Sequence, residues 1–191
     1  GQQMADDELR EVVNAAHALG RKVASHAHAA AGINAALRAG VDSIEHGSYA
    51  DQESIRLFKQ SGAYLVPTLM AGDTVVSMAK NTNFLSPIIR AKAIKVGGDM
   101  IANFKRAHES GVKIAYGTDS GVSAHGNNGK EAVLMHKAGM SVTDILVSAT
   151  VNAADLIGKS QSTGTIAAGK DADIIAMATS PYRDINAVLD V

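Results

Sequence analysis

The chain has 191 residues, a formal net charge of −1 and no cysteine. The near-neutral charge argues against a nucleic-acid-binding protein or one held on a membrane surface by basic residues. The lack of cysteine excludes disulfides, thiolate metal sites and cysteine nucleophiles. No apolar run approaches the roughly 18 residues of a membrane-spanning helix, and the start shows no signal-peptide pattern, so we expect a cytoplasmic protein.

One local pattern occurs repeatedly: an amphipathic helix, a glycine that ends it, and a short apolar strand. The first helix begins at Asp6, which is followed by acidic residues in the first turn, and ends at Gly20. The predicted helices of this type cover 6–19, 30–39, 51–61 and 87–110. The predicted strands cover 22–26, 41–46, 63–68 and 112–118. Strands that alternate with helices are typical of a parallel sheet covered by helices.

The rest of the chain changes character after the fourth strand. Further helices are predicted at 130–138, 142–149 and 153–157. Glycines and short β-prone runs over 164–177 predict a small β-element, so we divide the chain into domains 1–160 and 161–191. The stretch 70–86 is predicted to be the longest loop and carries no diagnostic chemistry.

Two architectures fit four parallel strands: an open doubly wound sheet and part of an eight-stranded barrel. A nucleotide-binding open sheet usually has a glycine-rich phosphate loop after its first strand. Residues 26–32 read HAHAAAG here, and no G-x-x-x-x-G-K-[ST] motif occurs. A nucleotide-binding domain is therefore only a third alternative. A barrel places its chemistry at the C-terminal ends of the strands, which directs attention to those positions.

Potential metal ligands occur at three of the four strand ends. The first strand ends at His26, the second at His46 and the fourth at Asp119, whereas the third ends at Thr68 without a ligand. Imidazole and carboxylate suit a borderline divalent ion such as zinc. A bound metal ion makes hydroxide available at neutral pH, and a carboxylate beside it can accept a proton. The pattern predicts part of a site for metal-assisted hydrolysis.

Structural explanations for these residues remain open at this point. A histidine in a strand can be an ordinary hydrogen-bonded residue, and Ile44 would share a strand face with His46, which fits a site poorly. Glu45 either orients His46 by accepting a hydrogen bond or is a plain polar residue. His28 either contacts metal or substrate or caps the following helix. We interpret the histidines on helices as surface or packing residues: His17, His108 and His136.

Several short motifs in a fixed order resemble a known family. They are VASHAH at 23–28, AGVDSIEHG at 39–47, GTDSG at 117–121, GTI at 164–166 and GKDAD at 169–173. Together they resemble the amidohydrolase superfamily, in particular its imidazolonepropionase-related and Xaa-Pro dipeptidase-like branch. The resemblance covers nearly the whole chain.

The resemblance implies a role for each matching residue. His26 matches the metal ligand at the end of the fifth barrel strand, and His46 matches the ligand at the end of the sixth. Asp119 matches the aspartate of the eighth strand, which binds metal and acts as general base toward the hydrolytic water. His125 matches a loop histidine that faces substrate, and we place His28 with it as a substrate-binding residue.

The resemblance also implies the fold: a partial TIM-type (β/α)8 barrel of the α/β class, comprising roughly strands five to eight. Residues 161–191 would be the remnant of a small β-sandwich domain and a C-terminal tail. The His-x-His of the family's first strand and the lysine of its fourth are missing. We expect either a truncated piece of a longer protein or a chain that a separate N-terminal half completes. Exposed sheet edges favour pairing with that half or self-association.

Two functions follow. The first is metal-dependent hydrolysis of a C–N bond in an amide, dipeptide or cyclic amide, with one or two zinc ions in the complete enzyme and a small molecule or dipeptide as substrate. The alternative is a non-catalytic half-barrel scaffold or assembly module that needs the N-terminal half.

Overall fold

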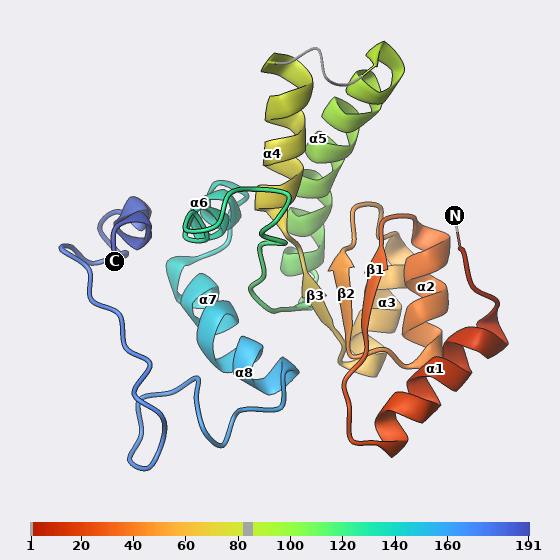
Figure 1. The fold of residues 1–191 in the computed structure, drawn as a ribbon, viewed down its shortest axis with the longest axis horizontal. Helices are drawn as coiled ribbons and strands as arrows, with labels where there is room; N and C mark the ends of the chain where they lie inside the picture. The colour runs from red at the N-terminus through yellow and green to blue at the C-terminus, as the bar shows by residue number, and fades with distance from the viewer. Residues whose placement is uncertain (1, 82–85) are drawn as a thin grey trace.

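The computed structural model describes residues 2–81 and 86–191 and contains one parallel sheet (Figure 1). Its strands are β1 (Ala24–Ala27), β2 (Ser43–His46), β3 (Tyr64–Val66) and β4 (Lys113–Ile114), and they lie in the order β1-β2-β3-β4. All three neighbouring pairs are parallel. A sheet that follows chain order without reversal is what a sector of a (β/α)8 barrel requires, whereas a doubly wound sheet reverses its order.

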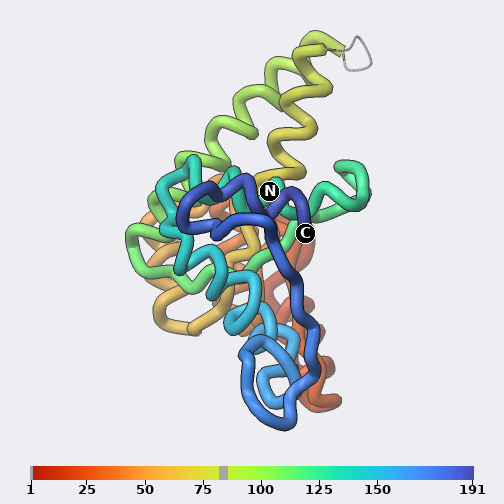
Figure 2. Tube along the Cα trace, turned by 90° about the vertical axis from the view of Figure 1, so that its left-hand side faces the viewer, coloured from red at the N-terminus to blue at the C-terminus, as the bar shows by residue number. Residues whose placement is uncertain are grey.

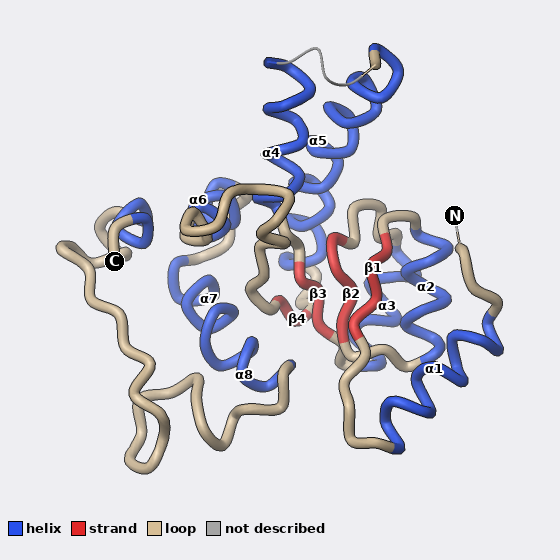
Figure 3. Tube along the Cα trace, in the orientation of Figure 1, coloured by secondary structure: helices blue, strands red, loops and turns tan. Residues whose placement is uncertain are grey.

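The helices alternate with the strands and then follow them (Figure 3). The α-helices are α1 (Asp6–Ala18), α2 (Ala30–Ala39), α3 (Gln52–Ser61), α4 (Leu69–Asn81), α5 (Pro87–Glu109), α6 (Lys130–Lys137), α7 (Val142–Val147) and α8 (Ala153–Leu156). A π-helical turn, η1 (Ser148–Asn152), joins α7 to α8, and a 3-10 helix, η2 (Ile185–Leu189), lies near the C-terminus. None of the helices in the described residues is long and apolar enough to cross a membrane.

Helix ends follow the sequence signals closely, as α3 illustrates. The Asp51 carboxylate accepts the backbone N–H of Ser54 at 2.8 Å, which satisfies one of the free donors of the first turn. The helix ends at Gly62, whose φ of 73° lies in the left-handed region that glycine adopts without a Cβ penalty.

The predicted loop at 70–86 is wrong for most of its length, because α4 occupies residues 69–81 and forms a hairpin with α5. Residues 82–85 of that prediction lie outside the described part of the chain. The hairpin projects from the rest of the molecule (Figure 2). Glycines allow its helices to pack closely: a Cβ on Gly97 would lie 2.2 Å from Val76 Cγ2. The sequence prediction failed because Gly72 and the nearby prolines suggest a break in helical structure.

The small β-element predicted at 164–177 is not confirmed, since these described residues form no strand. They form an irregular segment, with bends and turns between 164 and 170 and no regular structure over 171–177 (Figure 3). Its apolar side chains are largely in solvent: Ile166 is 95% exposed, Ile174 70% and Ile175 65%. A strand needs a hydrogen-bonded neighbour to satisfy its backbone groups, and β-prone residues without one stay irregular.

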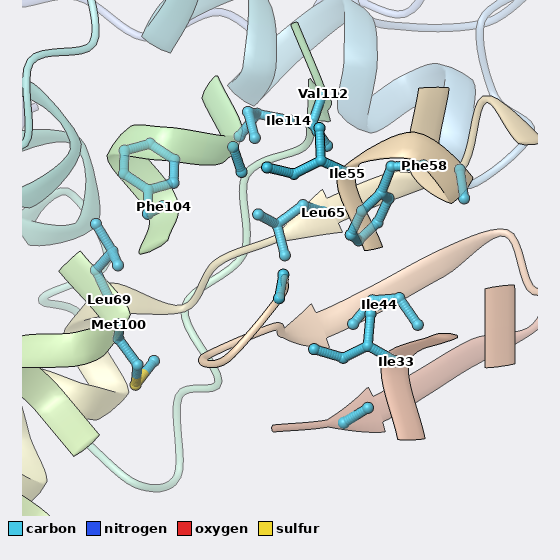
Figure 4. Packing of buried hydrophobic residues seen from close by; sticks show 14 of the residues in the cluster. Ile33, Ile44, Ile55, Phe58, Leu65, Leu69, Met100, Phe104, Val112 and Ile114 are labelled. Atoms are coloured by element: carbon cyan, nitrogen blue, oxygen red, sulfur yellow. The ribbon is translucent and has the colours of Figure 1, made fainter. Parts of the chain in front are cut away.

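The core lies between the sheet and its covering helices (Figure 4). On the helix-facing side of the sheet Ile44, Leu65 and Ile114 are fully or almost fully buried, and they pack with Phe58 and Phe104. The opposite face carries a smaller cluster of Tyr64, Val66 and Ala115. Ile114 and Ala115 thus face opposite sides of the sheet, as neighbouring residues along an extended strand do.

Candidate metal centre

The C-terminal ends of β1 and β2 bring three histidines together. His46 Nε2 lies 2.7 Å from His26 Nδ1, and potential ligand atoms of His26, His28 and His46 all lie within 4.8 Å of one another. The rings of His28 and His46 are stacked, with centroids 4.7 Å apart. His26 lies edge-on to both. The structure therefore clusters both histidines predicted as ligands with His28, one of the two histidines predicted to bind substrate.

An unusual backbone conformation turns His46 toward this cluster. Strict alternation would place His46 on the same face as Ile44, which is fully buried against the helices. Instead His46 has a φ of 68°, so its side chain leaves the alternating pattern and meets His26. The left-handed conformation therefore explains how His46 reaches the site although alternation would place it on the buried face with Ile44.

Two further strand ends adopt the same rare conformation. In the described part of the chain the non-glycine residues with positive φ are His46, Thr68 with 48° and Asp119 with 51°. His46 is the last residue of β2, Thr68 lies two residues after the end of β3, and Asp119 lies five residues after the end of β4. Such residues cost roughly 1–3 kcal/mol each and gather at functional sites, where the surrounding structure holds them in place. The shared strain therefore supports a site at this edge.

Hydroxyl groups hold the outer nitrogens of two histidines. Thr68 Oγ1 lies 2.6 Å from His46 Nδ1, and Ser48 Oγ lies 2.7 Å from His28 Nδ1. Both imidazoles keep Nε2 for the cluster, which is the arrangement that orients metal-binding histidines in proteins. Glu45 does not orient His46, because both ring nitrogens of His46 have other partners. The Glu45 carboxylate accepts the Ser43 hydroxyl at 2.6 Å.

The sequence reasoning missed Thr68 and Ser48, and it considered Thr68 only as a strand end without a ligand. Hydroxyl residues are too common for either to stand out. The one available signal is position: Thr68 follows the third strand, where the other strands carry histidine or aspartate.

The environment favours the neutral form of His46 and His28. The pKa of His46 is lowered to about 4, chiefly by burial and also by the neighbouring His28 and His26, while Asp119 acts in the opposite direction. Burial is also the largest cause that lowers the pKa of His28, followed by His26 and Lys92. The pKa of Glu45 is raised, chiefly by burial and also by Asp119. Neutral imidazole is the form that binds metal ions.

The donor set fits a borderline divalent ion such as zinc, because three imidazole nitrogen donors converge beside a carboxylate. Asp119 is near enough to influence the pKa of His46, although it is not part of the three-histidine group. His125 is exposed on the loop that follows β4 and is also outside that group. A cavity of about 570 Å³ adjoins His26 and His28 and is lined on one side by Lys92 of α5.

The helical histidines have partners elsewhere. His17 Nε2 lies 2.8 Å from the Asp42 carboxylate, which ties α1 to the start of β2. His108 stacks on Phe104 with the ring centroids 6.3 Å apart. His136 Nδ1 contacts the Met140 carbonyl at 3.2 Å. These contacts fit the packing roles expected from the sequence.

Comparison with known families decides the chain's affiliation, because the model of the amidohydrolase family matches residues 1–190. The chain belongs to the amidohydrolase family. It is 44% identical to a Xaa-Pro dipeptidase whose crystal structure contains bound methionine in the active site, with a TM-score of 0.94. That match covers 99% of this chain and 47% of the dipeptidase.

Two other proteins are also similar to this chain. Ochratoxinase from Aspergillus niger is 33% identical over 185 residues, which is 96% of this chain and 38% of that protein. Its crystal structure superposes with a TM-score of 0.84. A prolidase complexed with N-methylphosphonate-L-proline is 29% identical, with a TM-score of 0.88 over 98% of this chain and 46% of the prolidase. The chain thus spans less than half the length of each of these relatives.

Proposed function

We propose that this chain is part of a metal-dependent hydrolase that cleaves a C–N bond in an amide, a dipeptide or a cyclic amide. The observation that carries the proposal is the meeting of His46 Nε2 and His26 Nδ1, 2.7 Å apart, at the C-terminal edge of a parallel sheet. Active sites of barrel enzymes lie at this edge. The similarity to a Xaa-Pro dipeptidase and to ochratoxinase supports hydrolysis as the reaction class.

In this proposal His26, His46 and Asp119 hold one or two zinc ions, which suit their nitrogen and oxygen donors. A bound ion supplies Lewis-acid activation of water at neutral pH. Asp119 accepts the proton of the attacking water and passes it to the leaving nitrogen. His28 and His125 contact the substrate, and Thr68 and Ser48 orient the imidazoles of His46 and His28.

We further propose that the chain corresponds to strands five to eight of a (β/α)8 barrel and acts together with an N-terminal half. The order of the four strands and the less-than-half coverage of the relatives support this arrangement. Residues 161–191 then belong to a small β-domain, in which the exposed Ile166, Ile174 and Ile175 are covered by strands of the other half. The same observations support the alternative of a half-barrel assembly module without its own turnover.

Zinc binding by the purified chain tests the proposal. After zinc loading and dialysis, elemental analysis is expected to find at least one ion per chain, lost in His26→Ala and in His46→Ala. His136→Ala, on the surface of α6, is the matched control and keeps the metal. A chain that retains no zinc, or retains equal amounts in all variants, refutes the site. Release of amino acids from Xaa-Pro dipeptides by the zinc-loaded chain separates the hydrolase from the non-catalytic module.

A further inference from the structure

The buried carboxylate of Glu131, on α6, binds the N-terminus of α4, the helix that follows β3. Glu131 is 0% exposed, and its Oε1 accepts the backbone N–H of Leu69 at 2.8 Å while its Oε2 accepts that of Met70 at 2.6 Å. Leu69 and Met70 are themselves 3% and 1% exposed, so water does not replace this acceptor. A carboxylate at a helix N-terminus also interacts favourably with the helix dipole.

All four backbone N–H groups in the first turn of α4 have hydrogen-bond acceptors, and none of these acceptors is a side chain of α4 or of Thr68. The N–H groups of Leu69 and Met70 bind Glu131, while those of Ala71 and Gly72 bind the Thr68 carbonyl at 3.0 and 3.4 Å. A threonine before a helix ordinarily uses its hydroxyl to accept the second or third N–H of the first turn. Because Glu131 accepts the N–H of Met70, the Thr68 hydroxyl is free to bind His46 Nδ1 at 2.6 Å.

We propose that Glu131 is a positioning residue for His46: by capping α4 in place of Thr68, it releases the Thr68 hydroxyl to orient the imidazole. This inference depends on the proposed function in one respect: it takes His46 to be a metal ligand. In this arrangement Thr68 Oγ1 accepts the Nδ1–H of His46 and leaves the lone pair on Nε2 for the cluster. The tautomer of a histidine is set by the hydrogen bond that its other nitrogen makes.

The surroundings keep the Glu131 carboxylate in place. The next N–H along α6, that of Ala132, donates to the Tyr116 hydroxyl at 3.1 Å, which donates in turn to the Asn128 carbonyl at 2.6 Å. Lys130, the other neighbour of Glu131, forms an exposed ion pair with Asp73 of α4 at 2.6 Å. Lys130 also joins α6 to α4 but does not reach the first turn, which makes it a suitable control position.

The test compares Glu131→Gln, Thr68→Val and Lys130→Ala in the whole chain without metal. Long-range ¹⁵N–¹H correlation spectra at pH 7.5 report the tautomer of His46. We expect the Nδ1–H form in the parent and in Lys130→Ala, and a shift toward the Nε2–H form in the other two variants. Glu131→Asp, whose carboxylate is one methylene closer to the backbone, is measured as a second variant in case Glu131→Gln does not fold. An unchanged tautomer in the folded Glu131 variants overturns the proposal.

Zinc affinity gives an independent measure and separates the two proposals. Competition with a chelator is expected to show affinity 10- to 100-fold weaker in Glu131→Gln and in Thr68→Val, the usual effect of removing an orienting partner, and unchanged in Lys130→Ala. A tautomer shift in a chain that binds no zinc supports positioning and refutes the metal site. Equal zinc affinity and an equal tautomer in the parent and in the Glu131 variants refute positioning and leave the metal site standing.

Discussion

Gly47, which directly follows His46, offers a sharp test of the packing beneath the site. Its φ is 57°, and a Cβ added there would lie 2.5 Å from Leu65 Cδ1, in a core residue that is 0% exposed. The left-handed conformation costs a residue with a Cβ about 1–2 kcal/mol. Forcing an extra carbon into a packed core adds about 1–3 kcal/mol. We therefore expect Gly47→Ala to lower the free energy of unfolding by about 2–5 kcal/mol.

The matched control is Gly20→Ala. Gly20 has a φ of 65°, but a Cβ there meets no atom within 4 Å, so only the conformational part of the cost applies. Urea unfolding followed by circular dichroism should find Gly47→Ala less stable than Gly20→Ala by about 1–3 kcal/mol. Leu65→Ala should lower the free energy of unfolding less in the Gly47→Ala background than in the parent, because it removes the side chain that the new Cβ meets. Equal losses for the two glycine variants would contradict the close approach of Gly47 to Leu65.

Two other predictions concern the support of the site from α5 and α6. The Asn103 side-chain amide donates to the buried Gly47 carbonyl at 2.6 Å, so Asn103→Ala should lower the free energy of unfolding by about 1–3 kcal/mol. The control Asn14→Ala, at an exposed position, should change it little. Equal free energies of unfolding for the two variants in urea would show that this hydrogen bond does not stabilise the fold. Burial raises the pKa of Glu131 from 4.5 to about 7, so the folded chain binds this proton more tightly than the unfolded chain does. The free energy of unfolding of the parent, relative to that of Glu131→Gln, should therefore fall by up to about 3 kcal/mol as the pH rises from 4.5 through about 7. A difference between the two proteins that stays flat or rises between pH 5 and pH 8 would contradict this prediction.

The repeated helix–glycine–strand pattern was enough to predict the sheet. Glycines such as Gly40 and Gly62 have positive φ and end their helices where the sequence predicts. The α4–α5 hairpin was missed, because local propensity around Gly72 opposes a helix that packing against Met100 stabilises. The strands predicted within 164–177 are not confirmed for the opposite reason: their residues favour strand, but no neighbouring strand pairs with them in the described chain.

The site was predicted in part. His26 and His46 were found from their place at strand ends, and the structure brings them into contact. The orientation of His46 could not be predicted, since alternation assigns it to the wrong face and only its φ of 68° corrects this. The role of Thr68 depends on Glu131, which lies 62 residues from Leu69 along the chain, and no local pattern connects them. The metal-binding roles of His26, His46 and Asp119 and the substrate-binding roles of His28 and His125 remain predictions.

The central claim is that the histidines at the ends of β1 and β2 form a metal site. Anomalous diffraction at the zinc absorption edge, from crystals of the zinc-loaded chain, tests it most directly. We expect a peak within about 2.0–2.1 Å of a ring nitrogen of both His26 and His46. A peak elsewhere on the chain, with none at these two residues, would show that they do not form the metal site.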